Sequence, residues 1–264
     1  MPEGPEVKIA SDFFNHFFKK SRTIRFQIIT EYYHNKYDDI FKYLNKNLKI
    51  FQPSFCIGKN ILLPIKDNDF FNIHLGMTGG WSRKLEKHCH FRIYENSKEL
   101  FFKDVRKFGK IRIISQKEID DKYKKEFDML NNDYDFKKHL NHLNKRISDK
   151  KSICAAIMDQ KLFPGVGNYI KSETLYKSKI HPEKKWGELK NHQKINLMQN
   201  TKEIMLLSYK SGGAELRDFN NPFKKSDFQL MVYKKLRDHN NNIITSKTTS
   251  DQRKSWICDK IQKL

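Results

Sequence analysis

Long apolar runs are missing from this sequence of 264 residues. None approaches the roughly 20 consecutive apolar residues that a membrane-spanning helix needs, which excludes such a helix. No charged and apolar leader precedes the opening Met-Pro-Glu-Gly-Pro-Glu, so we expect no secretory signal peptide. We therefore expect a soluble, intracellular protein that does not bind membranes, located in the nucleus or the cytoplasm according to its source.

Cysteine is also scarce. The four cysteines, Cys56, Cys89, Cys154 and Cys258, include no pair with CxxC spacing. Sparse cysteines without a pattern are typical of reduced thiols and argue against a disulfide framework or a zinc site. We expect packing roles for these thiols, no metal and no other cofactor.

Acidic residues are outnumbered by basic ones. The chain has 31 Asp and Glu against 52 Lys and Arg, a net charge of +21 and a pI of about 9.7. Such an excess repels itself unless a polyanion neutralises it, so nucleic acid is the expected partner and an anionic membrane surface is the second candidate. Part of the charge is background, because an AT-rich genome also favours lysine.

Hydrophobic patterning divides the chain into two halves, and no internal repeat is found. Residues 7–19 carry apolar side chains at the spacing of one buried helix face. Successive β-type runs follow without helices between them and predict an antiparallel sandwich or barrel. These runs cover residues 23–30, 48–65, 70–75, 90–94, 100–102 and 110–114.

The polar, charge-mixed segment 115–126 is the expected linker to the second half. Beyond it the pattern becomes helical, at residues 136–143, 151–159, 168–177 and 192–209. The last forty residues are expected to form two strands around a polar tip at 239–243. Each half is large enough to bury its own core.

The first residues offer a chemical group that most proteins never use. Removal of Met1 before the small residue Pro2 would expose a secondary amine, and the ordinary pKa of an α-amino group, ~7.7–8, leaves part of it nucleophilic. Such an amine can form an iminium ion at a sugar carbon, with Glu3 as acid or base and Glu6 one helical turn on. Alternatively, Pro5 begins a helix whose dipole the glutamates complement, and these residues alone favour that interpretation.

Three further segments place single side chains on tight turns. Lys59, in Ile-Gly-Lys-Asn-Ile, stands at the tip of a turn from which a free ammonium can reach a phosphate. Met77 lies in His-Leu-Gly-Met-Thr-Gly, and Arg106 and Phe108 lie in Asp-Val-Arg-Lys-Phe-Gly-Lys. Side chains of these kinds fill the stack when a base is extracted from duplex DNA. Taken singly, an ordinary turn lysine and core residues at strand ends are the commoner explanations.

A glycine turn at residues 163–169, Phe-Pro-Gly-Val-Gly-Asn-Tyr, separates two helical segments. The helix that it opens presents backbone N–H groups that can bind phosphate without recognising base sequence. Asn168 can cap this helix and still donate its amide to a phosphate. A plain packing joint between two helices would look similar.

Together and in this order, these segments resemble the family of formamidopyrimidine-DNA glycosylase and endonuclease VIII. The resemblance spans nearly the whole chain through PEGPEV, GKN, HLGMTG, DVRKFGK, MDQKLFPGVGNYIKSETLYKSKIHP and SGGAELRDF. It implies an α+β fold that begins with an antiparallel β-sandwich with flanking helices, the catalytic domain, over residues 1–120. A helical helix–two-turn–helix domain over 121–230 and a β-hairpin finger over 231–264 are expected to follow.

The resemblance implies a bifunctional DNA glycosylase and abasic-site lyase of base excision repair. Pro2 would be the nucleophile at the sugar C1′, and Glu3 the acid that protonates the ring oxygen. Glu6 would help to organise the site, and Lys59 would contact the lesion strand. Base excision through a Schiff base would be followed by β- and then δ-elimination.

The resemblance also implies the DNA contacts. Met77, Arg106 and Phe108 would fill the gap left by the flipped nucleotide, with Arg106 facing the widowed base. Asn168 would clamp a phosphate. Arg253 is the candidate arginine of the finger.

The finger departs from the common family pattern of four cysteines on zinc. Residues 231–264 contain only Cys258, and His239 as a second ligand would not close a structural zinc site. We therefore predict a zincless finger, as in some endonuclease VIII-like relatives. Arg237 is a weaker alternative to Arg253 as the finger arginine.

Gly4, in PEGPEV, resembles endonuclease VIII-type members, which favour oxidised pyrimidines. We expect a monomer that removes lesions such as thymine glycol from damaged duplex DNA, with oxidised purines and single-stranded DNA as alternatives. A non-catalytic DNA-damage-binding protein would keep the basic surface and the finger without needing the amine of Pro2. An RNA-binding protein would explain the charge but not the combination of Pro2, Glu3 and Lys59.

Overall fold

The computed structural model describes residues 1–215, 221–223 and 225–264. The chain divides into two compact units, of which the first comprises residues 1–2, 6–123 and 215–226 and the second 3–5, 124–214 and 227–264. Part of the SGGAELRDF motif lies outside the described residues. The expected domain limits at residues 120 and 230 stay a prediction. In the described part of the chain, no helix has the length and apolar character needed to cross a membrane.

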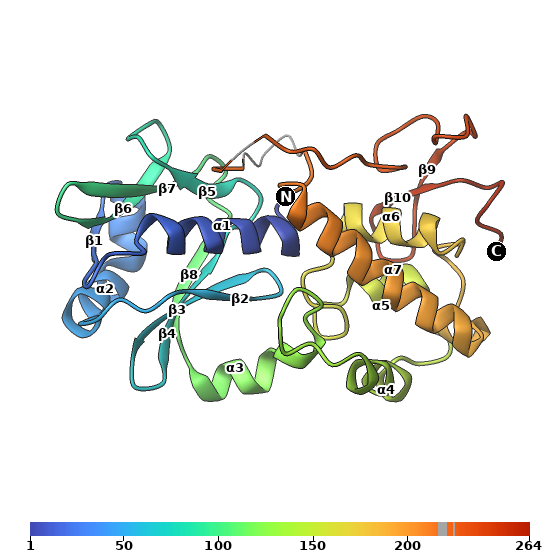
Figure 1. Ribbon diagram of the computed structural model, residues 1–264, viewed down its shortest axis with the longest axis horizontal. Coiled ribbons are helices and arrows are strands. Elements are labelled where there is room, and N and C mark those ends of the chain that lie inside the picture. Colours follow the sequence, from blue (N-terminus) through green and yellow to red (C-terminus); the bar gives the residue numbers. More distant parts are fainter. Residues whose placement is uncertain (216–220, 224) are drawn as a thin grey trace. The chain divides into compact units, whose positions relative to one another are not determined.

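Two four-stranded antiparallel sheets form the first unit and confirm the predicted sandwich (Figure 1). One sheet has, in spatial order, β1 (Arg25–Ile28), β6 (Cys89–Glu95), β7 (Lys98–Asp104) and β5 (Gly79–Ser82). The other has β2 (Phe55–Ile57), β3 (Asn60–Lys66), β4 (Asp69–His74) and β8 (Lys110–Ser115). The flanking helices are α1 (Gly4–Phe17) and α2 (Glu31–Asn47).

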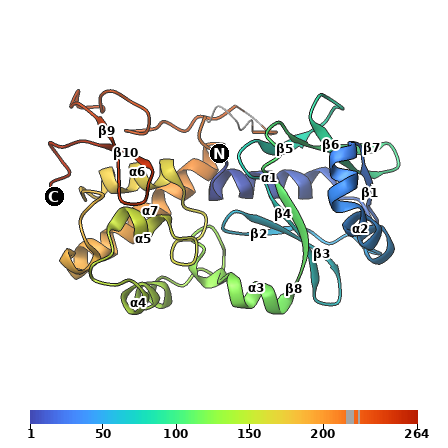
Figure 2. The ribbon, with the colours of Figure 1, turned by 180° about the vertical axis from the view of Figure 1, so that it is seen from behind.

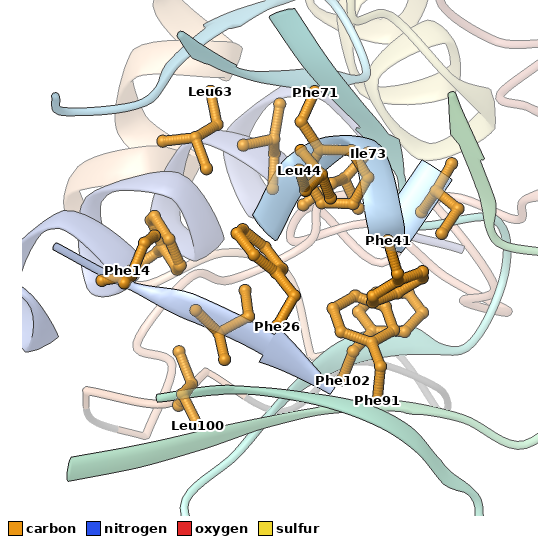
Figure 3. Packing of buried hydrophobic residues seen from close by; sticks show 14 of the residues in the cluster. Phe14, Phe26, Phe41, Leu44, Leu63, Phe71, Ile73, Phe91, Leu100 and Phe102 are labelled. Carbon is orange, nitrogen blue, oxygen red and sulfur yellow. The ribbon is translucent and has the colours of Figure 1, made fainter. Parts of the chain in front are cut away.

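Aromatic side chains from both sheets and both helices fill the core of the sandwich (Figure 3). Phe26 of the first sheet meets Phe71 of the second with ring centres 5.5 Å apart. Phe91 and Phe102, on neighbouring strands, stack at 4.9 Å. Because each such side chain contributes about 1.5–3 kcal/mol when fully buried, this cluster supplies much of the stability that holds the loops at the sheet ends.

Two elements of the sandwich differ from the sequence prediction. Helix α2 interrupts the strands that were expected to follow one another, and it buries a single face through Tyr33, Tyr37, Phe41 and Leu44. The expected linker contains α3 (Gln116–Lys122), because the Ser115 side chain accepts the Glu118 N–H and caps it.

The second unit is helical and ends in a two-stranded hairpin. Its helices are α4 (Phe136–Arg146), α5 (Ile153–Met158), α6 (Asn168–Lys177) and α7 (Asn191–Lys210), with single 3₁₀ turns at Lys125–Phe127 and Trp186–Glu188. Figure 2 shows α6 beside α7, as Figure 1 does from the opposite side. The hairpin pairs β9 (Thr245–Thr248) with β10 (Lys254–Ile257).

The hairpin tip lies at residues 249–253, so the predicted tip at 239–243 was wrong. Residues 238–242 form a separate turn ahead of β9, because the buried carboxylate of Asp238 accepts the N–H groups of Asn240 and Asn242 at 2.9 and 2.8 Å. Tyr176 of α6 donates its hydroxyl to the same carboxylate at 2.8 Å. Asp238 therefore ties the start of the finger to α6.

Candidate functional site

A group of cations surrounds His74 in the first unit. Burial lowers the pKa of His74, and the charges of Lys59, Lys110 and Arg112 lower it further. The imidazole accepts the Gly76 N–H at Nδ1 over 3.1 Å, as a neutral ring can. Lys59 is only 9% exposed, so the expectation of a free ammonium at the turn tip was wrong. Because the Lys59 ammonium lowers the pKa of His74, its charge lies near this residue of β4. Together with Lys110 and Arg112 it can attract one anion.

Met77, Arg106 and Phe108 come together on two loops of the first unit, with Arg106 and Phe108 exposed and Met77 half-buried. The Arg106 Nη1 lies 3.4 Å from the Met77 Sδ, and its guanidinium carbon lies 5.4 Å from the centre of the Phe108 ring. Gly76 has a φ of +64°, and a Cβ there would lie 2.5 Å from the Phe108 carbonyl carbon. Only glycine allows this approach. The three side chains form one apolar and cationic cluster, which we call the wedge.

The buried carboxylate of Asp104 joins the two loops of the wedge. Its Oδ2 accepts the Gly109 N–H at 2.7 Å, and its Oδ1 accepts the Thr78 hydroxyl. The Thr78 oxygen in turn accepts the Arg106 N–H at 2.9 Å. One carboxylate therefore fixes the loop that carries Met77 relative to the loop that carries Arg106.

Glu3 caps a helix of the second unit. Its Oε1 accepts the N–H of Tyr169 at 2.9 Å, and its Oε2 accepts that of Ile170 at 3.3 Å. The sequence predicted Asn168 as the cap, but the N-cap residue is Gly167, which has no side chain to use. A Cβ at Gly167 would lie 2.2 Å from the Glu3 Cδ, so glycine there makes room for the carboxylate. The N–H groups and the positive end of the helix dipole favour a negative charge at this place.

Asn168 and Tyr233 adjoin Glu3 in the second unit. The Asn168 Nδ2 donates to the Lys254 carbonyl at 3.0 Å. Burial raises the pKa of Tyr233, the Glu3 charge raises it further, and a hydrogen bond with Asn168 lowers it. Tyr233 was not predicted from the sequence, because a single tyrosine outside the family motifs gives no signal.

The two candidate finger arginines differ in their surroundings. Arg253 is exposed at the tip of the hairpin, one residue before the strand whose Lys254 carbonyl meets Asn168. Its N–H donates to the Asp251 Oδ1 at 3.3 Å. Arg237 is engaged at its own turn, where Nη1 donates to the Asn241 carbonyl at 2.9 Å. The guanidinium of Arg253 is therefore better placed than that of Arg237 to contact a ligand near Asn168.

Pro2 and Glu6 flank the start of α1. Both are buried, and Glu6 occupies the first turn of the helix, where its charge complements the dipole. This position agrees with the simpler interpretation of the N-terminal motif. It leaves the catalytic interpretation open as well, because a peptide bond joins Pro2 to Glu3 and so keeps an amine near a carboxylate.

Within the described ranges, no three His, Cys, Asp or Glu side chains are grouped so that they could hold a metal ion. In the finger, the Cys258 Sγ has the Asp238 carboxylate 3.9 Å away. A zincless finger stays a prediction.

Comparison with known proteins gives consistent results along the chain. Residues 1–111 match the model of the formamidopyrimidine-DNA glycosylase N-terminal domain, and residues 127–220 match that of the formamidopyrimidine-DNA glycosylase H2TH domain. The formamidopyrimidine-DNA glycosylase of Ureaplasma parvum serovar 3 is 30% identical over 235 residues, which cover 83% of this chain and 82% of that protein.

Two solved structures are similar over the full length of both chains. One is wild-type Lactococcus lactis Fpg (MutM) with DNA that contains N7-benzyl-Fapy-dG, at a TM-score of 0.81 and 25% identity. The other is MutM with DNA that contains carbocyclic 8-oxo-G, at a TM-score of 0.79 and 25% identity. Both complexes hold modified DNA.

Proposed function

The chain belongs to the formamidopyrimidine-DNA glycosylase family, and on that premise we propose how its own residues carry out base excision. It is a DNA glycosylase of base excision repair with lyase activity at abasic sites, and damaged DNA is its partner. Pro2 and Glu3 are the proposed catalytic residues. The observation that carries the proposal is the carboxylate of Glu3 at the start of α6, bonded to the amides of Tyr169 and Ile170.

In the proposed reaction, Glu3 enters as a carboxylate because two amides stabilise its charge. It accepts one proton from the ammonium of Pro2, exposed by removal of Met1, and the freed amine attacks C1′. The damaged base leaves with the electron pair of the N-glycosidic bond and takes up the second proton of the amine. Glu3 then gives its proton to the sugar ring oxygen as the ring opens, and an iminium ion joins the Pro2 nitrogen to C1′.

The iminium ion makes the neighbouring sugar carbon acidic. Loss of a proton from C2′ expels the 3′-phosphate by β-elimination, and a further elimination expels the 5′-phosphate. Glu6 is proposed to organise the site from the first turn of α1. Its buried charge can orient the start of α1, which directly follows Pro2 and Glu3.

The DNA contacts are proposed from charge and shape. Lys59 and the cations around His74 attract a phosphate of the lesion strand. The wedge of Met77, Arg106 and Phe108 is proposed to fill the gap in the stack, because Arg106 and Phe108 are exposed and Arg106 contacts both other side chains. Asn168 is proposed to contact a phosphate beside the finger strand that its amide already meets. The exposed guanidinium of Arg253 holds another phosphate from the hairpin tip.

For the lesion we propose oxidised pyrimidines, on the strength of Gly4 in PEGPEV. A second candidate, oxidised purines, is favoured by the modified guanines in the complexes of the similar proteins. The structure gives Gly4 a reason that is independent of the lesion, since a Cβ there would lie 2.9 Å from the Met205 Cε and 3.1 Å from the Gly165 Cα. Excision rates on matched duplexes with thymine glycol, dihydrouracil, 8-oxoguanine and a formamidopyrimidine decide between the two.

Borohydride trapping tests the mechanism. The wild type, with its N-terminus checked by mass, should give covalent adducts with damaged-base and abasic duplexes. Pro2→Gly should lower trapping on both, and Glu3→Gln should lower it mainly on the damaged base, where excision must come first. Glu31→Gln, which removes an exposed glutamate at the start of α2, is the matched control. A wild type that binds DNA tightly but gives no adduct would be a binding protein without this chemistry.

A further inference from the structure

A buried ion pair connects the finger to α6. The Lys171 Nζ lies 2.7 Å from the Asp251 Oδ2, and the two side chains are 0% and 4% exposed. Lys171 stands three residues after Asn168, on the helix that Glu3 caps. Asp251 lies in the hairpin turn, two residues before Arg253. The pair therefore joins the elements that carry the two proposed phosphate contacts of the second unit.

Stability does not explain why two charges are buried here. Desolvation of both ions offsets most of their attraction, and apolar residues of similar volume often serve a fold as well. Burial lowers the pKa of Lys171. Burial would raise the pKa of Asp251, but the hydrogen bonds from Lys171 and Thr249 hold it below its ordinary value. Net stability therefore gives little reason for this ion pair. Its geometry indicates a different role, which is to hold the hairpin turn in place.

The Asp251 carboxylate organises the turn that carries Arg253. While Oδ2 accepts from Lys171, Oδ1 accepts the Thr249 hydroxyl at 2.6 Å and the Arg253 N–H at 3.3 Å. Gln252, between them, has a φ of +59°, a conformation that costs free energy for a residue other than glycine. The ion pair thus holds a strained turn in one shape relative to α6.

Further contacts attach the same turn to the helical part of the unit. The Ser250 N–H donates to the Glu183 Oε1 at 2.7 Å, and its hydroxyl lies 2.6 Å from that of Ser152. A hairpin with two four-residue strands has little stability of its own, so its position depends on such attachments. The ion pair of Lys171 with Asp251 connects this turn to α6, the helix that begins with Asn168.

We propose that Lys171 and Asp251 are positioning residues that fix Arg253 relative to Asn168, so that both grip the phosphate backbone at one spacing. The inference rests on the proposed function, because Arg253 as a DNA contact is itself proposed. Neither Lys171 nor Asp251 touches DNA in this account. They keep the exposed guanidinium of Arg253 in place before DNA binds. Less conformational entropy is then lost when the complex forms.

The test compares binding of a duplex with a tetrahydrofuran abasic analogue. Lys171→Met/Asp251→Leu removes both charges and leaves no unpaired ion, so the protein is expected to stay folded. Its unfolding midpoint should fall somewhat, because the Thr249 hydroxyl and the Arg253 N–H lose an acceptor. Lys171→Gln/Asp251→Asn, a neutral hydrogen-bonding pair of similar shape, is the second variant. The matched control is Lys177→Met/Glu203→Leu, which removes an exposed ion pair that also starts from α6.

We expect Arg253→Ala and the two variants of the buried pair each to weaken binding about tenfold and to lower the salt slope by about 1, as loss of one phosphate contact does. The control should change binding less than twofold. Because the pair acts through Arg253, its removal in an Arg253→Ala background should weaken binding no further.

Each alternative result has a definite meaning. If Arg253→Ala binds as tightly as the wild type, the proposed DNA contact fails, and the inference fails with it. If Arg253→Ala weakens binding but the folded pair variants do not, the inference alone is overturned. Losses that add in the triple variant would also overturn it, since the pair would then act on binding by a route other than Arg253.

Discussion

Asp104 offers the sharpest test of how the first unit prepares the wedge. Its carboxylate accepts the Gly109 N–H at 2.7 Å and the Thr78 hydroxyl, and it is 0% exposed. Asp104→Ala leaves the buried Gly109 N–H and the half-buried Thr78 hydroxyl without their acceptor. Asp104→Asn keeps the shape and one carbonyl oxygen, so only one of the two donors loses its partner.

The free energies follow from these contacts. A buried donor left without a partner costs about 1–3 kcal/mol. Asp104→Ala, with one buried and one half-buried donor, should therefore lower the free energy of unfolding by about 3 kcal/mol, and Asp104→Asn by about half as much. Because Thr78 then loses its orientation, the Arg106 loop moves more freely. We expect lesion-duplex binding to weaken about tenfold, or about 1.4 kcal/mol.

Two measurements separate stability from wedge position. Urea unfolding gives the change in the free energy of unfolding. Insertion of the wedge is measured with 2-aminopurine placed beside the lesion. Its fluorescence reports unstacking when the wedge enters the duplex. Thr78→Val should reproduce the fluorescence defect, whereas Thr78→Ser, which keeps the hydroxyl, should behave as the wild type. Normal fluorescence and normal duplex binding in a destabilised Asp104→Ala protein would refute the link between this carboxylate and the wedge.

Three further predictions concern the second unit. Gly167→Ala should displace the Glu3 carboxylate, because the added Cβ would lie 2.2 Å from its Cδ; single-turnover excision should fall at least tenfold while cleavage of preformed abasic DNA falls less. The buried carboxylate of Glu173 accepts the N–H groups of residues 231–233 at 2.6–3.0 Å, whereas an amide offers only one oxygen. Glu173→Gln should therefore lower the free energy of unfolding by about 2 kcal/mol in urea titrations. Burial lowers the pKa of His139 from 6.5 to about 4, so the unfolded chain binds more protons between these pH values. The free energy of unfolding should fall as the pH drops from about 6.5 to 4, by at most about 1.4 kcal/mol per pH unit, and His139→Gln should flatten this dependence.

Helix α1 could be predicted because its buried apolar residues recur at the spacing of one helix face. Helix α6 has no single apolar face, since residues 169–176 are all buried, but it was predicted as well. Helix α6 begins and ends where the pattern placed it, at Asn168 and Lys177. Helix α2 was missed although Tyr33, Tyr37, Phe41 and Leu44 have helical spacing, because polar and charged residues outnumber the apolar ones in its sequence. The tip of the finger was misplaced because the polar run at 239–243 is an equally good turn sequence. An Asp carboxylate accepts backbone N–H groups in both turns, and the pairing of β9 with β10 across residues 249–253 distinguishes them.

The site shows a similar limit. Motif order was enough to group Met77, Arg106 and Phe108, and the structure brings these three together. No local pattern predicts that Glu3 caps a helix that begins 165 residues later, or that Gly167 lacks a side chain to make room for it. The hydrogen bonds of Asp104 and the ion pair of Lys171 likewise depend on contacts between distant segments. Such contacts leave no periodic signal in one sequence.

The placement of acidic residues adds a second explanation for the basic character of the chain. Glu3, Glu6, Asp104, Glu173 and Asp238 are buried. Of these, Glu3, Asp104, Glu173 and Asp238 accept backbone N–H groups. Because these acids are buried, the described surface has fewer negative charges beside its lysines and arginines than the composition implies. This arrangement lets the same few acids order the loops of the proposed site and leave the basic surface available to DNA, whose binding should weaken steeply with salt.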